Sequence, residues 1–138
     1  MSQVEEKLAL SLTAETTALL PFLPYLLQDL WALGSAPKDI IQLLSDHVRV
    51  LAKSRVLELA CGKGAVAVHV TKTFGCQVKG IDLIPEFIEY ARQKAVEYGV
   101  AQNCEFVAAD INEAIGSEYG YDIVMMLAVE LDMLVAPG

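Results

Sequence analysis

The stretch Val56–Ala67 constrains the fold more than any other part of the chain. It reads V-L-E-L-A-C-G-K-G-A-V-A, so an apolar run meets a glycine turn at Gly62 and Gly64 and continues into a helical pattern. Such a run is typical of a strand buried on both faces of a parallel sheet. A side chain at either glycine would keep a ligand from the backbone, and N–H groups of the following helix would face the turn. The stretch therefore predicts a site for a nucleotide-like ligand at the carboxyl end of a parallel strand.

Beyond residue 54 the hydrophobic pattern predicts strands and helices in alternation. In chain order, the predicted elements are a strand Arg55–Ala60, a helix Gly64–Phe74 ended by Gly75, a strand Gln77–Asp82, a helix Pro85–Tyr98 with Gly99 as its C-cap, a strand Glu105–Ala109 and a strand Tyr121–Ala128. Alternation of this kind favours right-handed crossovers and a parallel sheet with helices on both faces. We therefore predict an α/β fold with a doubly wound, mainly parallel sheet.

About fifty residues at the start of the chain show only helical periodicity. Helices are expected over roughly Val4–Leu20, over Tyr25–Leu33 and from a cap at Ser35 to about Leu51. We therefore divide the chain into an N-terminal helical segment, residues 1–52, and a ligand-binding core, residues 53–138. The helical segment is expected to pack on the ligand site or to cover it.

The charge of the chain limits its partners. It has 138 residues, with 18 acidic and 10 basic side chains and a formal net charge of −8. Its length suits one domain, and hydrophobic residues, 54% of the total, are enough for a sizeable core. A surface with this charge repels phosphate backbones, so no nucleic-acid partner is expected. Three cysteines without metal-ligand spacing and two histidines argue against a metal site.

No targeting or membrane-spanning segment is apparent in the sequence. The start of the chain lacks the basic and then apolar regions of a signal peptide. The apolar run near Leu19–Leu27 is broken by Pro21 and Pro24 and is too short to cross a bilayer. We therefore expect a cytoplasmic protein without a membrane partner.

Two classes of cofactor fit the glycine turn. The residues from Gly62 onward match G-x-G-x-x-A, and Asp82 follows Gly62 by twenty positions. The same spacing marks dinucleotide sites, in which the acid binds the ribose hydroxyls, so a NAD-dependent dehydrogenase is one alternative. Three features favour another class: Glu58 inside the strand, the helices that precede it, and a second acid, Asp110, which ends the third strand and precedes Ile111.

With these features the chain resembles the class I S-adenosylmethionine-dependent methyltransferases. The resemblance covers about residues 55–128 and is carried by several motifs in the family's order and spacing. These motifs are Glu58-Leu59-Ala60-Cys61-Gly62-Lys63-Gly64, Gly80-Ile81-Asp82-Leu83, Ala91-Arg92 with Gly99, Phe106-Val107-Ala108-Ala109-Asp110-Ile111 and Tyr121-Asp122-Ile123-Val124. The resemblance implies a Rossmann-like, doubly wound sheet in which the strands present have the order 3-2-1-4, with N-terminal helices before it.

The resemblance also implies S-adenosyl-L-methionine as the cofactor, S-adenosyl-L-homocysteine as the product and no metal. The cofactor-binding residues that it implies are Glu58, Ala60, Gly62, Gly64, Asp82, Leu83, Asp110, Ile111 and Leu127. The two glycines would admit the methionine portion to the backbone. Glu58 would hold the ammonium group of that portion, directly or through water, by a charge-assisted hydrogen bond.

The nucleoside portion would be held by residues at the ends of the next two strands. Asp82 would accept both ribose hydroxyls, and Leu83 would pack on the adenine face. Asp110 would accept from the adenine amine, with the Ile111 amide near a ring nitrogen. Each acid also has a structural interpretation, since Glu58 can cap a buried amide and the two aspartates can be ordinary acids at strand ends.

Other conspicuous side chains have simpler interpretations. Lys63 is expected to be solvated, and Cys61 to be a small buried residue rather than a nucleophile. His69 is expected to be structural or exposed. Trp31 is expected to lie in the core, while Tyr25 fits either the core or a lid over the cofactor.

The residues after the fourth predicted strand bear on the methyl acceptor. Leu127–Glu130 would line the pocket for the donor and the acceptor, Glu130 or Asp132 is expected to touch the acceptor, and Glu130 is the candidate catalytic residue. The Asn/Asp-Pro-Pro-aromatic motif of many nucleic-acid amine methyltransferases is absent. This absence and the acidic charge favour a small-molecule acceptor. The alternative is a non-catalytic binding module on the same fold.

The family's sheet has seven strands, of which four can be placed in this chain. The fourth would then present Ile123–Val129 as an apolar edge, which favours pairing with another chain. Three interpretations follow: the chain is a fragment, or it forms a homodimer through this edge, or its fold is altered.

Overall fold

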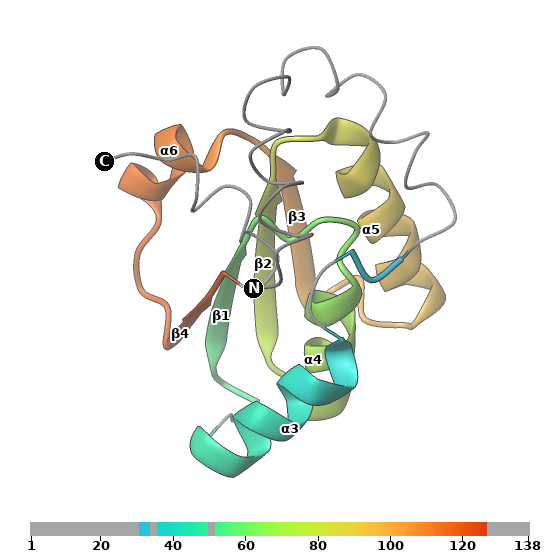
Figure 1. The fold of residues 1–138 in the computed structure, drawn as a ribbon, viewed down its shortest axis with the longest axis vertical. Helices are drawn as coiled ribbons and strands as arrows, with labels where there is room; N and C mark the ends of the chain where they lie inside the picture. The colour runs from blue at the N-terminus through green and yellow to red at the C-terminus, as the bar shows by residue number, and fades with distance from the viewer. Residues whose placement is uncertain (1–30, 34–35, 50–51, 127–138) are drawn as a thin grey trace, which may run out of the picture.

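The computed structural model describes residues 31–33, 36–49 and 52–126 (Figure 1). These residues form a parallel four-stranded sheet with the strand order β3-β2-β1-β4. The strands are β1 Arg55–Leu59, β2 Gln77–Asp82, β3 Cys104–Ala108 and β4 Ile123–Met125. The register pairs Val56 of β1 with Val78 of β2 and Ile123 of β4. The predicted doubly wound α/β fold and the strand order 3-2-1-4 are therefore confirmed.

Helices cover both faces of this sheet. They are α3 Pro37–His47, α4 Ala65–Phe74, α5 Pro85–Glu97 and the short α6 Ile111–Ala114, followed by the 3-10 turn η2 Ile115–Ser117. Figure 1 shows α4 and α5 on the opposite side of the sheet from α6. Because strand side chains alternate, Val56 and Val78 join a large apolar cluster on one face, whereas Leu57 and Leu59 join a smaller one with Ile111 on the other. None of the described helices is long and apolar enough to cross a membrane.

The connection between β1 and α4 turns more sharply than predicted. β1 ends at Leu59 rather than at Ala60, because Ala60 has a φ of +55° and leaves the extended backbone. α4 begins at Ala65 rather than at Gly64, since Gly64 is its N-cap with a φ of +79°. A left-handed backbone suits glycine but costs other residues about 1–2 kcal/mol. Ala60 therefore carries local strain at the carboxyl end of β1.

Several other elements end at residues that differ from the predicted ones. The helix α3 is predicted from a cap at Ser35 to about Leu51 and runs from an N-cap at Ala36 to His47, and α5 is predicted to end at Tyr98 and ends at Glu97. The strand β3 is predicted at Glu105–Ala109 and spans Cys104–Ala108. The strand β4 is predicted at Tyr121–Ala128 and spans Ile123–Met125. Residues 127 and 128 lie outside the described residues. Tyr98 takes the C-cap position of α5, and Gly99 follows it with a φ of +72°. Hydrophobic periodicity locates an element, but its last backbone hydrogen bond depends on local caps.

α6 and η2 are absent from the predicted elements. Asp110 is the N-cap of α6, and its Oδ1 accepts the Asn112 N–H at 2.8 Å. Glu113 follows three positions after the cap, a spacing typical of a helix start. A helix of four residues is too short to show a hydrophobic period, so this capping pattern is the signal that identifies it.

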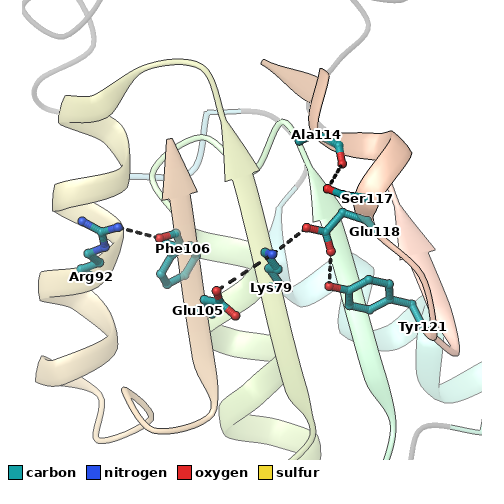
Figure 2. Close-up of polar contacts among 8 residues, drawn as sticks. All are labelled: Lys79, Arg92, Glu105, Phe106, Ala114, Ser117, Glu118 and Tyr121. Atoms are coloured by element: carbon teal, nitrogen blue, oxygen red, sulfur yellow. Dashed lines mark hydrogen bonds and ion pairs between the residues drawn. The ribbon is translucent and has the colours of Figure 1, made fainter. Parts of the chain in front are cut away.

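A polar cluster fastens the segment before β4 to the sheet (Figure 2). Lys79 of β2 donates to Glu118 Oε1 at 2.6 Å, and the Tyr121 hydroxyl donates to Glu118 Oε2 at 2.5 Å. These two donors hold the pKa of the Glu118 carboxyl below its usual range. Burial and the bond to Glu118 raise the pKa of Tyr121 to about 12. The polar cluster lies on the same face of the sheet as the smaller apolar cluster and adjoins it.

The two outer strands of the described sheet differ in how they are covered. Arg92 of α5 donates from Nη2 to the Phe106 carbonyl of β3 at 2.8 Å (Figure 2), which occupies a backbone acceptor of that strand. On β4, Val124 is 57% exposed, and Met126 just beyond it is exposed as well. An apolar edge of this kind favours pairing with another strand. Formation of a homodimer through β4 stays a prediction.

The predicted division at residue 52 also stays a prediction, because most of the first segment lies outside the described residues. Its described part includes α3, which places Ile40 and Leu44 in the large apolar cluster beside α4. These residues therefore share one core with the sheet.

Replacing Gly64 by alanine is expected to destabilise the fold for two reasons. The added Cβ would lie 2.7 Å from the Ala91 Cβ of α5, and the φ of +79° would strain any side chain. We expect a loss of about 2–5 kcal/mol in the free energy of unfolding, the sum of left-handed strain and overpacking. Urea denaturation measures this loss.

Gly99→Ala is the matched control, because Gly99 has a similar φ of +72° and nothing within 4 Å of its missing Cβ. It is expected to lose only the strain, about 1–2 kcal/mol. Equal losses in the two variants would show that the contact with α5 contributes nothing.

Candidate functional site

Asp82 organises the edge of the sheet at which β1 and β2 end. Its Oδ2 accepts the N–H of Gly62 at 2.8 Å, and its Oδ1 accepts the N–H of Ile84 at 3.0 Å. The Cys61 N–H also donates to the Ile81 carbonyl at 3.0 Å. One side chain therefore fixes the glycine turn after β1 relative to the turn after β2. The structure brings these two predicted parts of the site together.

Glu58 lies in β1, under this turn, and only 1% of it is exposed. Burial, and then the negative charge of Asp82, raise the pKa of its carboxyl from 4.5 to about 8, against a smaller opposite effect of a hydrogen bond with the Ala67 backbone. Within the part of the chain that the structure describes, Glu58 Oε1 has no hydrogen-bond partner. A buried acceptor without a donor is costly and rare. The predicted site therefore contains a buried acid with one carboxyl oxygen to which no described residue donates.

Lys63 is buried, with 4% of its surface exposed, so the prediction of a solvated side chain is wrong. Its ammonium group lies 4.9 Å from the ring centroid of Tyr90 and 5.8 Å from that of Phe87, both on α5. Aromatic faces attract a cation at such distances, and more strongly where water is excluded. The side chain therefore anchors the glycine turn to α5, a tertiary contact that no local pattern predicts.

The glycines of the turn have different structural roles. A Cβ at Gly64 would meet Ala91 at 2.7 Å and Phe106 at 3.0 Å, so this glycine is required for packing, while its predicted contact with a ligand stays a prediction. A Cβ at Gly62 would lie 3.3 Å from Leu33 Cδ1. Leu33 therefore lies against the backbone that a ligand was expected to approach.

The other predicted cofactor-binding residues follow the ends of β2 and β3. Leu83 is 52% exposed directly after Asp82. Asp110 caps α6, and Ile111 begins that helix and packs against the smaller apolar cluster. Their assignment to the adenine stays a prediction. Leu127, Glu130 and Tyr25 lie outside the described residues.

Cys61 and His69 have structural roles, as predicted. Cys61 is buried, and burial together with the charges of Glu58 and Asp82 raises the pKa of its thiol well above its usual range. A thiol held neutral in this way is a poor nucleophile. His69 Nδ1 lies 2.7 Å from the Ala65 carbonyl of the preceding helical turn.

The raised pKa of Glu58 predicts a pH dependence of stability. Its contribution to the free energy of unfolding is largest below pH 4.5, where the carboxyl group is protonated in both states. Between pH 4.5 and about 8 only the unfolded chain releases the proton, so stability falls by about 1.4 kcal/mol per pH unit. Urea denaturation of the wild type and of Glu58→Gln across this range measures the effect. The variant is expected to lack this slope, and parallel profiles for the two proteins would contradict it.

Comparison with known proteins places this site in a family. A family model described as a methyltransferase domain matches residues 56–137. YqeM of Bacillus subtilis (strain 168), which is named as a methyltransferase, is 33% identical over 82 residues that make up 59% of this chain and 32% of YqeM. The chain spans at most about a third of the length of the first curated relatives that it matches. Other relatives are named as methyltransferases of norajmaline and of 23S rRNA.

Solved structures show the same relationship. An S-adenosylmethionine-dependent methyltransferase from Thiobacillus denitrificans, in complex with S-adenosyl-L-homocysteine, has a TM-score of 0.62 and 28% identity over 75% of this chain and 40% of that one. An RNA methyltransferase from Salinibacter ruber, also in complex with S-adenosyl-L-homocysteine, has a TM-score of 0.59 and 28% identity over 67% of this chain and 59% of that one. The family model, the strand order and the glycine turn agree. The chain belongs to the class I S-adenosylmethionine-dependent methyltransferase family.

Proposed function

We propose that this chain binds S-adenosylmethionine and supplies the methyl-donor side of a methyltransferase. The observation that carries the proposal is Glu58, a buried acid whose Oε1 has no hydrogen-bond partner within the described residues. An ammonium group can both donate to this oxygen and neutralise the carboxylate. The methionine portion of S-adenosylmethionine carries such a group, whereas NAD carries none. The residues present therefore fit S-adenosylmethionine better than a dinucleotide.

The remaining contacts follow from the order of the strand ends. We assign the ribose hydroxyls to Asp82, which two backbone N–H groups already orient. We assign the adenine to the region of Leu83, whose apolar side chain is exposed, and of Asp110. When bound, S-adenosylmethionine supplies an electrophilic methyl group. The role of this chain is to hold the methyl group in line with an acceptor, because alignment is the main requirement when the acceptor displaces the sulfur from the methyl carbon.

We propose a small molecule as the methyl acceptor. A formal net charge of −8 supports this class over RNA, because a polyanion is repelled by such a surface. The matched relatives differ in acceptor, so family membership alone does not select one. The proposed acceptor side, Leu127–Glu130, lies outside the described residues.

Calorimetric titration with S-adenosyl-L-homocysteine tests the cofactor assignment. The wild type is expected to bind it saturably and to leave NAD unbound. Glu58→Gln is expected to weaken binding about 10-fold to 100-fold, because it replaces a charged hydrogen bond by a neutral one. Binding also moves Glu58 from its protonated to its ionised form near pH 7, so heat in buffers of different ionisation enthalpy should show proton release.

Two controls make the titration specific. Glu89→Gln changes an exposed acid of α5 and should bind like the wild type. An analogue of S-adenosyl-L-homocysteine without the amino group should bind the wild type more weakly than S-adenosyl-L-homocysteine does. For Glu58→Gln the two ligands should differ much less in affinity, because the variant has already lost the charged partner of the amino group. Tighter binding of NAD than of S-adenosyl-L-homocysteine would instead favour the dehydrogenase alternative.

Turnover separates an enzyme from a non-catalytic binding module on the same fold. We expect the chain to release S-adenosyl-L-homocysteine from S-adenosylmethionine with a small-molecule acceptor from a panel of amines, alcohols and acids, and not with RNA. Mass spectrometry of the product measures this. Cofactor binding without turnover on any acceptor would favour the binding module, and turnover on RNA would contradict the acceptor class.

A further inference from the structure

Trp31 joins three parts of the fold that are distant in the sequence. Its indole N–H donates to the Lys63 carbonyl in the glycine turn at 3.0 Å. Its ring centroid lies 5.0 Å from that of His69 on α4 and 5.2 Å from that of Tyr98 at the end of α5. The ammonium group of Lys94 lies 4.9 Å from the same ring. Both the apolar body and the polar edge of the indole are thus used, which is typical of a fixed tryptophan.

The residue that Trp31 holds is the centre of the turn. Lys63 stands between Gly62 and Gly64, which have the greatest backbone freedom of any residue type. Its ammonium group is fixed over the Tyr90 ring, and its carbonyl by the indole. Asp82 accepts the N–H of Gly62, and the N–H of Gly64 donates to the Cys61 carbonyl at 3.0 Å. The indole bond therefore adds a second restraint, from outside the turn, to a peptide whose N–H already closes the turn.

Leu33 extends the same contact along the turn. It follows Trp31 by two residues, and its Cδ1 lies 3.3 Å from the position that a Cβ on Gly62 would take. Residues 31–33 therefore run against the glycine turn, with one side chain on the carbonyl of Lys63 and another on Gly62. Residues 31–33 therefore border the proposed methionine subsite on one side.

We propose that Trp31 is a positioning residue that latches residues 31–33 onto the glycine turn and holds the turn in its cofactor-binding shape. The inference rests on the proposed function for its ligand, but the latch itself exists in the free chain. Trp31 acts through the Lys63 carbonyl and touches no reacting atom. Loss of the indole donor is expected to loosen the turn while the sheet stays intact.

Trp31→Phe tests the latch, because it keeps a six-membered aromatic ring and removes the N–H donor with the five-membered ring that carries it. We expect its amides at Gly62, Lys63 and Gly64 to exchange hydrogen faster than in the wild type, while those of β2 exchange at the wild-type rate. We also expect about a 3-fold to 10-fold loss of affinity for S-adenosyl-L-homocysteine, the value of one hydrogen bond. Exchange measured by NMR and titration by calorimetry give the two results.

Tyr121→Phe is the matched control, since it also removes one hydrogen bond, to Glu118, but far from the turn. It should change neither the exchange of the turn nor the affinity. Wild-type exchange and affinity in Trp31→Phe would overturn the latch, and so would faster exchange spread over all strands. If the wild type fails to bind S-adenosyl-L-homocysteine, the proposed function fails, whereas faster exchange confined to the turn still supports the latch.

Discussion

The carboxylate of Asp82 determines the geometry on which the candidate site depends. It accepts the N–H of Gly62 at 2.8 Å and that of Ile84 at 3.0 Å, so it fixes the ends of two neighbouring strands with one side chain. Because β1 and β2 are parallel and adjacent, their carboxyl ends lie at the same edge of the sheet. A charge-assisted bond to each backbone donor makes this arrangement stronger than two neutral bonds would be.

The carboxylate of Asp82 also disfavours the ionised form of Glu58 in the chain without a ligand. Burial already disfavours the ionised form of Glu58, and the charge of Asp82 adds to that effect, so the pKa rises to about 8. An apolar residue at this place in β1 would pack without an unsatisfied oxygen. A local cost that the fold does not need is typical of a functional site, where a ligand removes it. Among the described residues, the unpartnered oxygen of Glu58 is therefore the best indication of the ligand.

Much of this arrangement can be predicted from the sequence, and the rest cannot for identifiable reasons. The period of apolar residues predicts all four strands and the helices α3, α4 and α5, because burial on two faces leaves a long and regular pattern. The burial of Lys63 escapes prediction, since it depends on Tyr90, more than twenty positions away on another helix. The contact of Trp31 with the turn is equally nonlocal. Of these three unpredicted features, α6 alone has a local signal in the sequence: its capping acid, Asp110. Hydrophobic periodicity does not detect such a signal.

The glycine pattern indicates the fold more strongly than it indicates the cofactor. Gly64 leaves room for Ala91 of α5, and Gly80 of β2 leaves room for Cys61 and Phe106, each of which would lie within 3.0 Å of an added Cβ. Any parallel sheet that packs a helix so closely needs glycine there, whatever it binds. The pattern therefore separates this fold from others but separates methyltransferases poorly from dinucleotide enzymes. Glu58 makes that second distinction, because its buried Oε1, without a partner among the described residues, favours a ligand that carries an ammonium group.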